Sequence, residues 1–388
     1  PKVSLKKVHT SSWFSFLSKA FRRVLRNPVL ITVTSLMIAV ISLYGISLLK
    51  INTYLIEDLP SDDPLKMDFA HFDNNFGGSR PFEIDVQVRD DELTIFHPLV
   101  IREIEKVDNY LKGPFEAGNL ISPAIMVKMI NQATSGGLSS QFKLPDSDWS
   151  DVNRNLKRFL ASSEAARIVT EDQKRARISA KVGDIGSAIS LERTKELREF
   201  IDKNTNKDIV RFTVTGTSNL IDKNNEYLAN NMFQGLGIAF LVVAAIAGFM
   251  FRSFRMVLIT LIPNVIPLLM VAGIMGYFDI ALKLSTSIVF TIAFGIAVDD
   301  TIHFISKFKL ELDKGKSILY ALKRTYLSTG KAIIITSIIL SGGFLTLILS
   351  SFGGTFYTGL LVSLTLIFAL VIDLTLLPVL IMLFYRRR

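Results

Sequence analysis

The 388-residue sequence contains no cysteine, two tryptophans and four histidines. Without cysteine the chain forms no disulfide and no thiolate metal site. His71 and His97 stand alone in the sequence, whereas a zinc site needs three or four convergent ligands. Gly77 and Gly78 are not followed by the lysine and hydroxyl residue of a phosphate-binding loop, and no other ATP-binding signature is present. We therefore expect no cofactor, no metal and no enzymatic activity.

Long apolar runs are what the sequence has in abundance. Hydrophobic residues make up 49% of the chain, and the mean hydropathy is positive. A run of about twenty apolar residues is long enough to cross a bilayer as a helix. Six such runs are predicted, at Pro28–Leu49, Met232–Phe251, Met256–Tyr277, Leu284–Ile305, Lys331–Ser351 and Phe356–Tyr385. The sequence thus predicts a polytopic membrane protein.

The net charge of +9 is unevenly distributed. Lysine and arginine gather before the first run, after the second and fourth, and at the end of the chain, in Arg386–Arg388. Positive residues mark the cytoplasmic ends of spans, so both termini are expected in the cytoplasm. The long polar stretch 50–231, where acidic residues outnumber basic ones, then lies on the other side. Basic residues beside spans contact membrane lipids, so we expect no nucleic-acid partner. The predicted location is a bacterial inner membrane, with the large domain in the periplasm.

The polar stretch shows the alternation typical of strands and the periodicity typical of helices. Strands are predicted at Phe82–Val88, Leu120–Ser122, Arg175–Val182 and Ile209–Thr215, and helices at Pro98–Leu111 and Leu191–Ile201. The order is β-α-β, an insertion at about 123–170, then β-α-β. The predicted fold is a membrane α-helical bundle of six transmembrane helices, with an α+β, ferredoxin-like (split βαβ) extracytoplasmic domain inserted after the first helix. A helix over 217–231 is expected to run into the second span and to couple the domain to the membrane.

These features divide the chain into six segments. Two are expected to be amphipathic and cytoplasmic: a linker before the first span, with Trp13, Leu17 and Phe21 on one face, and a linker helix after the fourth, with Leu322 and Tyr326 in the lipid interface. The predicted segments are 1–27 (linker), 28–49 (transmembrane helix 1), 50–231 (extracytoplasmic domain), 232–305 (transmembrane helices 2–4), 306–330 (linker helix) and 331–388 (transmembrane helices 5–6 and a basic tail).

The stretch GIAVDDTIHF, Gly295–Phe304, places Asp299 and Asp300 inside the fourth run. A charge at the middle of a bilayer costs at least ~2.5–3.5 kcal/mol, and ionisable residues there tend to mark ion paths. We expect the two acids to bind and release protons; the alternative is that they fix helix packing through hydrogen bonds. His303 lies within one helical turn of both acids, and capping the span at the interface is an equal alternative for it.

Further polar, small and helix-breaking residues lie inside the other runs. Asp373 stands in the sixth, and the hydroxyls of Thr336 and Ser337 stand in the fifth. Small residues allow close helix approach, and proline permits a kink. The residues predicted to shape helix packing in this way are Gly295, Gly342, Gly343, Pro263, Pro267 and, between the prolines, Asn264.

One helix, an exported domain and five more helices with acids in the fourth form an arrangement that resembles half of a resistance-nodulation-division (RND) transporter. The motifs GIAVDDTIHF, LIPNVIPLL, ITSIILSGGFLTLILSSF and DLTLLPVLI are similar to those of the MMPL-like or Patched-like exporter branch. The paired acids and the basic linker at the start resemble a C-terminal half. The chain departs from the multidrug-pump branch, whose intramembrane lysine it lacks.

The resemblance implies proton-driven export of hydrophobic or lipid-like substrates, with the exported domain as a porter. The proton gradient would replace a cofactor as energy source. The implied relay acids are Asp299 and Asp300 with hydroxyl partners Thr336 or Ser337; His303 and Asp373 join the candidate relay. The implied partner is the N-terminal half of the same transporter or a second half-transporter, in an oligomer.

Two other functions remain open on the sequence. One is an accessory role in protein translocation, as in SecD/SecF relatives, which have a similar membrane core. The other is a sterol- or lipid-sensing membrane protein without a transport cycle. A bound lipid in the exported domain would favour export, and a captured unfolded polypeptide would favour translocation.

Overall fold

A computed structural model describes residues 12–162 and 165–385. The start of the predicted first linker and the three terminal arginines lie outside these residues. The chain forms two compact units. The helical unit comprises Pro1–Asn52 and Tyr227–Arg388, and the inserted unit comprises Thr53–Glu226.

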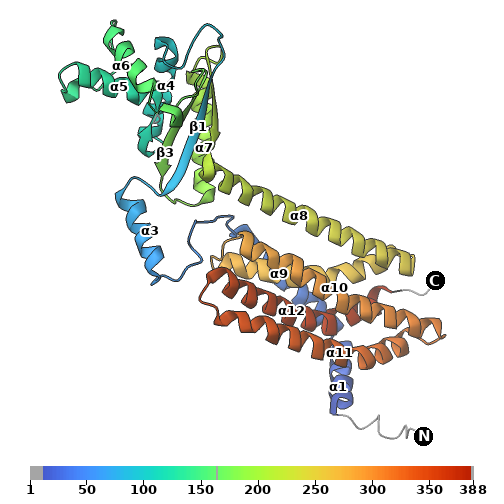
Figure 1. The fold of residues 1–388 in the computed structure, drawn as a ribbon. Coiled ribbons are helices and arrows are strands. Elements are labelled where there is room, and N and C mark those ends of the chain that lie inside the picture. Colours follow the sequence, from blue (N-terminus) through green and yellow to red (C-terminus); the bar gives the residue numbers. More distant parts are fainter. Residues whose placement is uncertain (1–11, 163–164, 386–388) are drawn as a thin grey trace, which may run out of the picture. The chain divides into compact units, whose positions relative to one another are not determined.

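Six helices of the described residues are long and apolar enough to cross a membrane, which confirms a multi-pass membrane protein. Five belong wholly to the helical unit, and α8 begins in the inserted unit and runs on without a break. Helices α9 to α12 lie side by side (Figure 1). The six are α2 (Pro28–Ser47), α8 (Gly216–Phe251), α9 (Phe254–Tyr277), α10 (Leu284–Asp313), α11 (Ile318–Leu345, followed by a 3-10 turn at Thr346–Leu349) and α12 (Gly353–Phe384).

Helix α1 (Ser12–Arg26) packs its apolar face against protein. Leu17 and Phe21 are buried, and the Phe21 ring centroid lies 5.1 Å from that of Tyr326 on α11. The predicted amphipathic helix is therefore present. Its apolar side belongs to the core of the helical unit.

The predicted linker helix at 306–330 is wrong. Helix α10 continues to Asp313, and α11 begins at Ile318 after a turn in which Gly315 has a φ of +78°. Across this turn, the carboxylate of Glu311 on α10 lies 3.3 Å from the guanidinium of Arg324 on α11. Leu322 and Tyr326 are buried between helices instead of facing lipid. An amphipathic pattern predicts an apolar neighbour, and here that neighbour is protein.

Helices α2 and α9 approach each other so closely that only glycine fits at the contact. A Cβ added at Gly276 would lie 1.8 Å from the carbonyl oxygen of Gly45. One added at Gly273 would lie 2.8 Å from the Cα of Ser42. Small residues let the two helix backbones pack over a large area. Such packing stabilises helix pairs in a bilayer, where the hydrophobic effect does not drive helices together.

The inserted unit contains a four-stranded sheet in the order β2-β3-β1-β4, and every neighbouring pair is antiparallel. In the central register Ile84 of β1 stands opposite Ile178 of β3 and Val214 of β4. The strands are β1 (Arg80–Val88), β2 (Gly118–Ile121), β3 (Arg175–Val182) and β4 (Val210–Thr215). The helices are α3 (Pro64–Asn75), α4 (Pro98–Lys112), α5 (Pro123–Thr134), α6 (Ser150–Leu160) and α7 (Ser187–Asn204), with 3-10 turns at Ser139–Gln141 and Ala165–Arg167.

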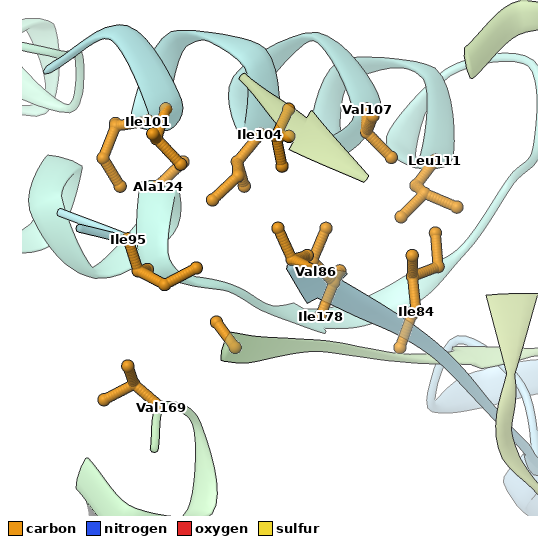
Figure 2. Close-up of a cluster of buried hydrophobic side chains, with 14 of the residues drawn as sticks. Ile84, Val86, Ile95, Ile101, Ile104, Val107, Leu111, Ala124, Val169 and Ile178 are labelled. Carbon is orange, nitrogen blue, oxygen red and sulfur yellow. The ribbon is translucent and has the colours of Figure 1, made fainter. Parts of the chain in front are cut away.

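The core of this unit lies between the sheet and α4. Alternate residues of β1 and β3 are buried, which puts one apolar face of each strand toward the helix. In Figure 2 the side chains of Ile101, Ile104, Val107 and Leu111 on α4 point toward Ile84 and Val86 of β1 and Ile178 of β3. Burying each such side chain stabilises the fold by roughly 1.5–3 kcal/mol.

A buried arginine joins the two ends of the inserted unit. Arg80 begins β1, and its guanidinium lies 2.5 Å from the carboxylate of Asp222 on α8 and 3.5 Å from that of Asp184. Asp184 also accepts a hydrogen bond from the backbone N–H of Leu55 at 2.8 Å. One cation therefore holds together the segment that begins the unit and the helix that leaves it.

Asp108 on α4 is a buried acid in this unit, 1% exposed. Its carboxylate accepts a hydrogen bond from Ser122, whose hydroxyl in turn accepts one from the backbone N–H of Ile125 and so caps α5. Burial raises the pKa of Asp108 to about 7; the Ser122 hydrogen bond and the nearby lysines act in the opposite direction. Asp108 thus stays protonated in the folded unit at pH values where an unfolded chain has released the proton.

This difference predicts pH-dependent stability. The folded chain binds a proton that the unfolded chain lacks between about pH 4 and pH 7, so the contribution of Asp108 is lost as pH rises through this window. At pH 8 the ionised, buried Asp108 lowers the free energy of unfolding by on the order of a few kcal/mol, at ~1.4 kcal/mol per pKa unit. We expect Asp108→Asn to melt at a higher temperature than wild type at pH 8, and the gap to shrink toward pH 5.

Thermal unfolding in a Trp13→Phe background, followed by the fluorescence of Trp149, tests this, because Trp149 packs against the same core. Asp146→Asn is the matched control, since that carboxylate is exposed and should show no such trend. A gap between Asp108→Asn and wild type that does not change with pH would contradict the prediction.

Candidate functional site

Three consecutive residues of α10 reach three different surroundings. Successive residues of a helix point about 100° apart, so Asp299, Asp300 and Thr301 fan out around the helix axis. Asp299 is exposed, Asp300 is half-buried and Thr301 is fully buried. The acid pair of the sequence is therefore divided between an outer and an inner face of the helical unit.

The innermost of the three joins a buried hydrogen-bond cluster across three helices. The hydroxyl of Thr301 donates to Asp373 Oδ1 on α12 at 2.9 Å. Asn264 on α9 donates its Nδ2 to Thr301 Oγ1 at 3.1 Å and to the Thr260 carbonyl at 2.8 Å. Asp373 is 2% and Asn264 1% exposed. The sequence predictions for Asp373 and Asn264 thus fall in one cluster.

Asp300 faces the neighbouring helix α11. The hydroxyl of Ser337, which is buried, donates to Asp300 Oδ2 at 3.2 Å. Of the two hydroxyls considered as partners for the acids, Thr336 instead donates to carbonyls of its own helix, those of Ala332 and Ile333, at 3.0 Å each. Ser337 is therefore the better candidate for the hydroxyl partner of Asp300.

Asp299 and His303 lie on the outer face of α10. His303 Nε2 is 3.5 Å from Asp299 Oδ1, and both side chains are 71% exposed within this chain. One turn earlier, a Cβ added at Gly295 would meet no described atom within 4 Å. The same is true of Gly342 and Gly343 on α11. Close helix packing at these three glycines therefore stays a prediction.

The prolines of α9 sit inside a helix that continues past them. Pro263 and Pro267 are buried, and the helix is assigned without a break from Phe254 to Tyr277. Proline removes a backbone donor, which leaves carbonyls one turn earlier without their usual partner. Between the two prolines, the side-chain amide of Asn264 donates a hydrogen bond to the carbonyl of Thr260, one turn earlier, at 2.8 Å. Asn264 is thus tied both to its own helix and to Thr301.

The sequence reading did not single out Thr301, although it stands inside the quoted motif next to the acids. A hydroxyl beside a charged pair gives a weak signal, because most such hydroxyls in spans bond to their own backbone. Only the position of Asp373 across from it gives Thr301 its role. The sequence likewise contains no signal for Asp108 and Arg80, because their partners, Ser122 and Asp222, are brought to them only by the fold. Within the described residues no cluster of three or more metal-ligating side chains is present.

The chemistry available here is proton binding. Among the described residues no lysine or arginine forms an ion pair with Asp300 or Asp373, and the hydroxyls of Ser337 and Thr301 donate hydrogen bonds to them. A carboxylate without a cation is costly in a membrane, whereas a neutral carboxylic acid is far less so. These two acids therefore gain more from protonation than an exposed acid would.

Removing the shared hydroxyl should loosen the cluster. Thr301→Val keeps the side-chain shape but leaves Asp373 and Asn264 without their common partner. An unsatisfied buried polar group costs about 1–3 kcal/mol, so we expect a lower melting temperature in detergent. Thr301→Ser keeps the hydroxyl and is the matched control. Equal stability of the Val and Ser variants would show that the hydrogen bonds are not needed.

Comparison with known proteins shows the family to which the chain belongs. The model of the MMPL family matches residues 115–388, which is more than half of the chain. The chain is also similar to MJ1562 of Methanocaldococcus jannaschii, a protein named as a membrane protein. The two are 24% identical over 362 residues, covering 92% of this chain and 90% of that protein. With its six candidate spans and an acid pair inside the fourth, the chain belongs to the MMPL family of membrane proteins.

Proposed function

We propose that the chain is one half of a secondary transporter that exports hydrophobic or lipid-like molecules at the expense of a proton gradient. The observation that carries the proposal is the pair of acids inside the spans: Asp300 and Asp373 each accept a hydrogen bond from a hydroxyl, and among the described residues neither pairs with a lysine or arginine. Members of the MMPL family are transporters, which supports transport over catalysis. No ATP-binding motif is present in the sequence, so an ion gradient is the energy source we infer.

Protonation would act on the contacts between helices. In the ionised state Asp300 accepts the hydroxyl proton of Ser337 on α11. Once protonated, Asp300 itself becomes a donor, so the preferred hydrogen-bond geometry between α10 and α11 changes. One charge crossing 100 mV gains ~2.3 kcal/mol. That amount shifts the balance between two helix arrangements of similar energy, which is what a transport cycle requires.

The outer face of α10 supports pairing with a second half. Thr291, Gly295, Asp299 and His303 recur every four residues and are all exposed within this chain. A polar stripe of this kind is expensive against lipid, and intramembrane ionisable residues face the interior of a bundle. An N-terminal half of the same transporter, or a second half-transporter, would cover the stripe and bring Asp299 inside the complete bundle.

We further infer that the inserted unit is a ferredoxin-like porter domain outside the cytoplasm. The sheet order β2-β3-β1-β4 and the two β-α-β segments support the fold. The orientation is supported by the positive residues at the ends of α8, α10 and α1, which favour the cytoplasmic side. In a bacterium with an outer membrane, the helical unit would lie in the inner membrane and the inserted unit in the periplasm.

Neutralising the acids should stop export. Asp299→Asn, Asp300→Asn and Asp373→Asn preserve size and hydrogen-bonding capacity but cannot titrate. We expect each to lower export at least roughly tenfold, the scale of ~1.4 kcal/mol in a coupling step. The measurement is release of a fluorescent lipid from cells that make the complete transporter, with and without a protonophore.

Asp279→Asn is the matched control, because that acid is exposed and pairs with Lys50 at 2.9 Å outside the apolar spans. Thermal melts establish that each variant is folded. Normal export by folded Asp300→Asn and Asp373→Asn proteins would refute the relay. Wild-type export that is indifferent to the protonophore would refute proton coupling, and absence of any lipid release would favour a sensing role.

A further inference from the structure

Two adjoining cavities lie where α8 ends and α9 begins in the helical unit. One has a volume of about 740 Å³, and its walls carry the cations Arg252, Arg255 and Lys309. The other has a volume of about 780 Å³, and its walls include Ala245, Ile246 and Phe249. Met250, Phe251, Arg252 and Lys309 border both, so a basic space adjoins an apolar one.

The lining of the basic space carries more positive than negative charge. Among the described residues neither Arg252 nor Arg255 has an ion-pair partner, and both are exposed. The ammonium of Lys309 donates to the carbonyl of Met250 and lies 5.7 Å from the centroid of the Phe251 ring. Asp313 is the acidic residue among the lining side chains, against three cations. An anion in this space would therefore find uncompensated positive charge.

The backbone at the end of α8 fixes the position of these cations. Arg252 has a φ of +45°, a left-handed conformation that is uncommon for residues other than glycine. Its N–H donates to the Gly248 carbonyl at 2.7 Å, which closes the helix end. The chain then reverses at Ser253 and enters α9 at Phe254, so Arg252 and Arg255 stand on the two sides of one short turn.

The apolar space extends along α8 away from this turn. Residues 245 and 252 are separated by roughly 10 Å along a helix axis, at 1.5 Å per residue. Phe249 is 85% exposed and Ile246 45% exposed, so this wall of the cavity is apolar and uncovered within the chain. The combination of a basic end and an apolar shaft has the dimensions of a phosphate group followed by the first part of an acyl chain.

We propose that this space binds an anionic phospholipid, with its phosphate at Arg252 and Arg255 and an acyl chain beside Ile246 and Phe249. Basic pockets between spans at the cytoplasmic side are suited to anionic headgroups, since arginine offers paired donors to phosphate. A free phosphate would leave the apolar half of the space unused. The site lies apart from Asp300 and Asp373 and does not depend on the transport proposal.

Native mass spectrometry of the intact chain in detergent tests the site. The probes are dioleoylphosphatidylglycerol and dioleoylphosphatidylcholine, which share acyl chains and differ in headgroup charge. We expect wild type to retain the anionic lipid preferentially. Arg252→Gln with Arg255→Gln should weaken its retention on the order of tenfold and leave the zwitterionic lipid unaffected. Ala245→Trp, which keeps every cation but fills the apolar space, should weaken retention of the anionic lipid as well.

The matched control is Arg23→Gln with Lys323→Gln. It removes two exposed charges from α1 and α11 that do not line either cavity. Equal loss of anionic lipid in this control would show general charge attraction and overturn the site. Equal retention of both lipids by wild type would overturn it too. Displacement of the lipid by millimolar inorganic phosphate would identify a free-anion site instead, and melting temperatures establish that the variants are folded.

Discussion

The helical unit depends on one constraint: a polar group inside a bilayer has no water to bond with, so it needs a partner from the protein. Asp373 is the group for which this matters most, because it is buried in the middle of α12. Its hydroxyl donor comes from α10, and that donor is held by an amide from α9. Hydrogen bonds, as well as side-chain packing, therefore determine how these three helices cross. Ser341 and Ser363 repeat the device between α11 and α12, where each hydroxyl donates to the carbonyl of the other residue.

The same constraint explains why the outer face of α10 matters. The Asp299 carboxylate lies 3.5 Å from the His303 ring. Neither side chain forms another ion pair or hydrogen bond among the described residues. The inserted unit handles its own buried charge differently, since Arg80 is matched by two carboxylates of that unit. Breaking such a pair by removing one partner costs about 3–5 kcal/mol, because the remaining charge stays buried. The contrast is between a buried charge whose partners lie in its own unit and an exposed acid that lies beside His303.

Much of the fold could be predicted from the sequence, because its signals are local. Apolar length predicted the spans, and alternation predicted β1 and β3 to within two residues. The linker helix at 306–330 was wrong because an amphipathic pattern does not tell lipid from protein, and Tyr326 packs on α1. In the site, the acids were found from their improbable position in an apolar run. The division of Asp299 from Asp300 depends on the contact of Asp300 with Ser337, 37 positions away, and the link from Thr301 to Asp373 spans 72 positions. No local pattern carries that information.

The glycine contact between α2 and α9 has a mechanical consequence. With the Gly45 carbonyl oxygen only 1.8 Å from the position a Cβ would take at Gly276, even a methyl group would separate the helices. Neither helix is free to rotate against the other, because rotation would bring a bulkier side chain into the gap. Any conformational change of the helical unit would therefore move α2 and α9 together. Relative sliding is left to the helices that meet through longer side chains, and in particular to α8, whose apolar stretch buries the smallest share of its surface.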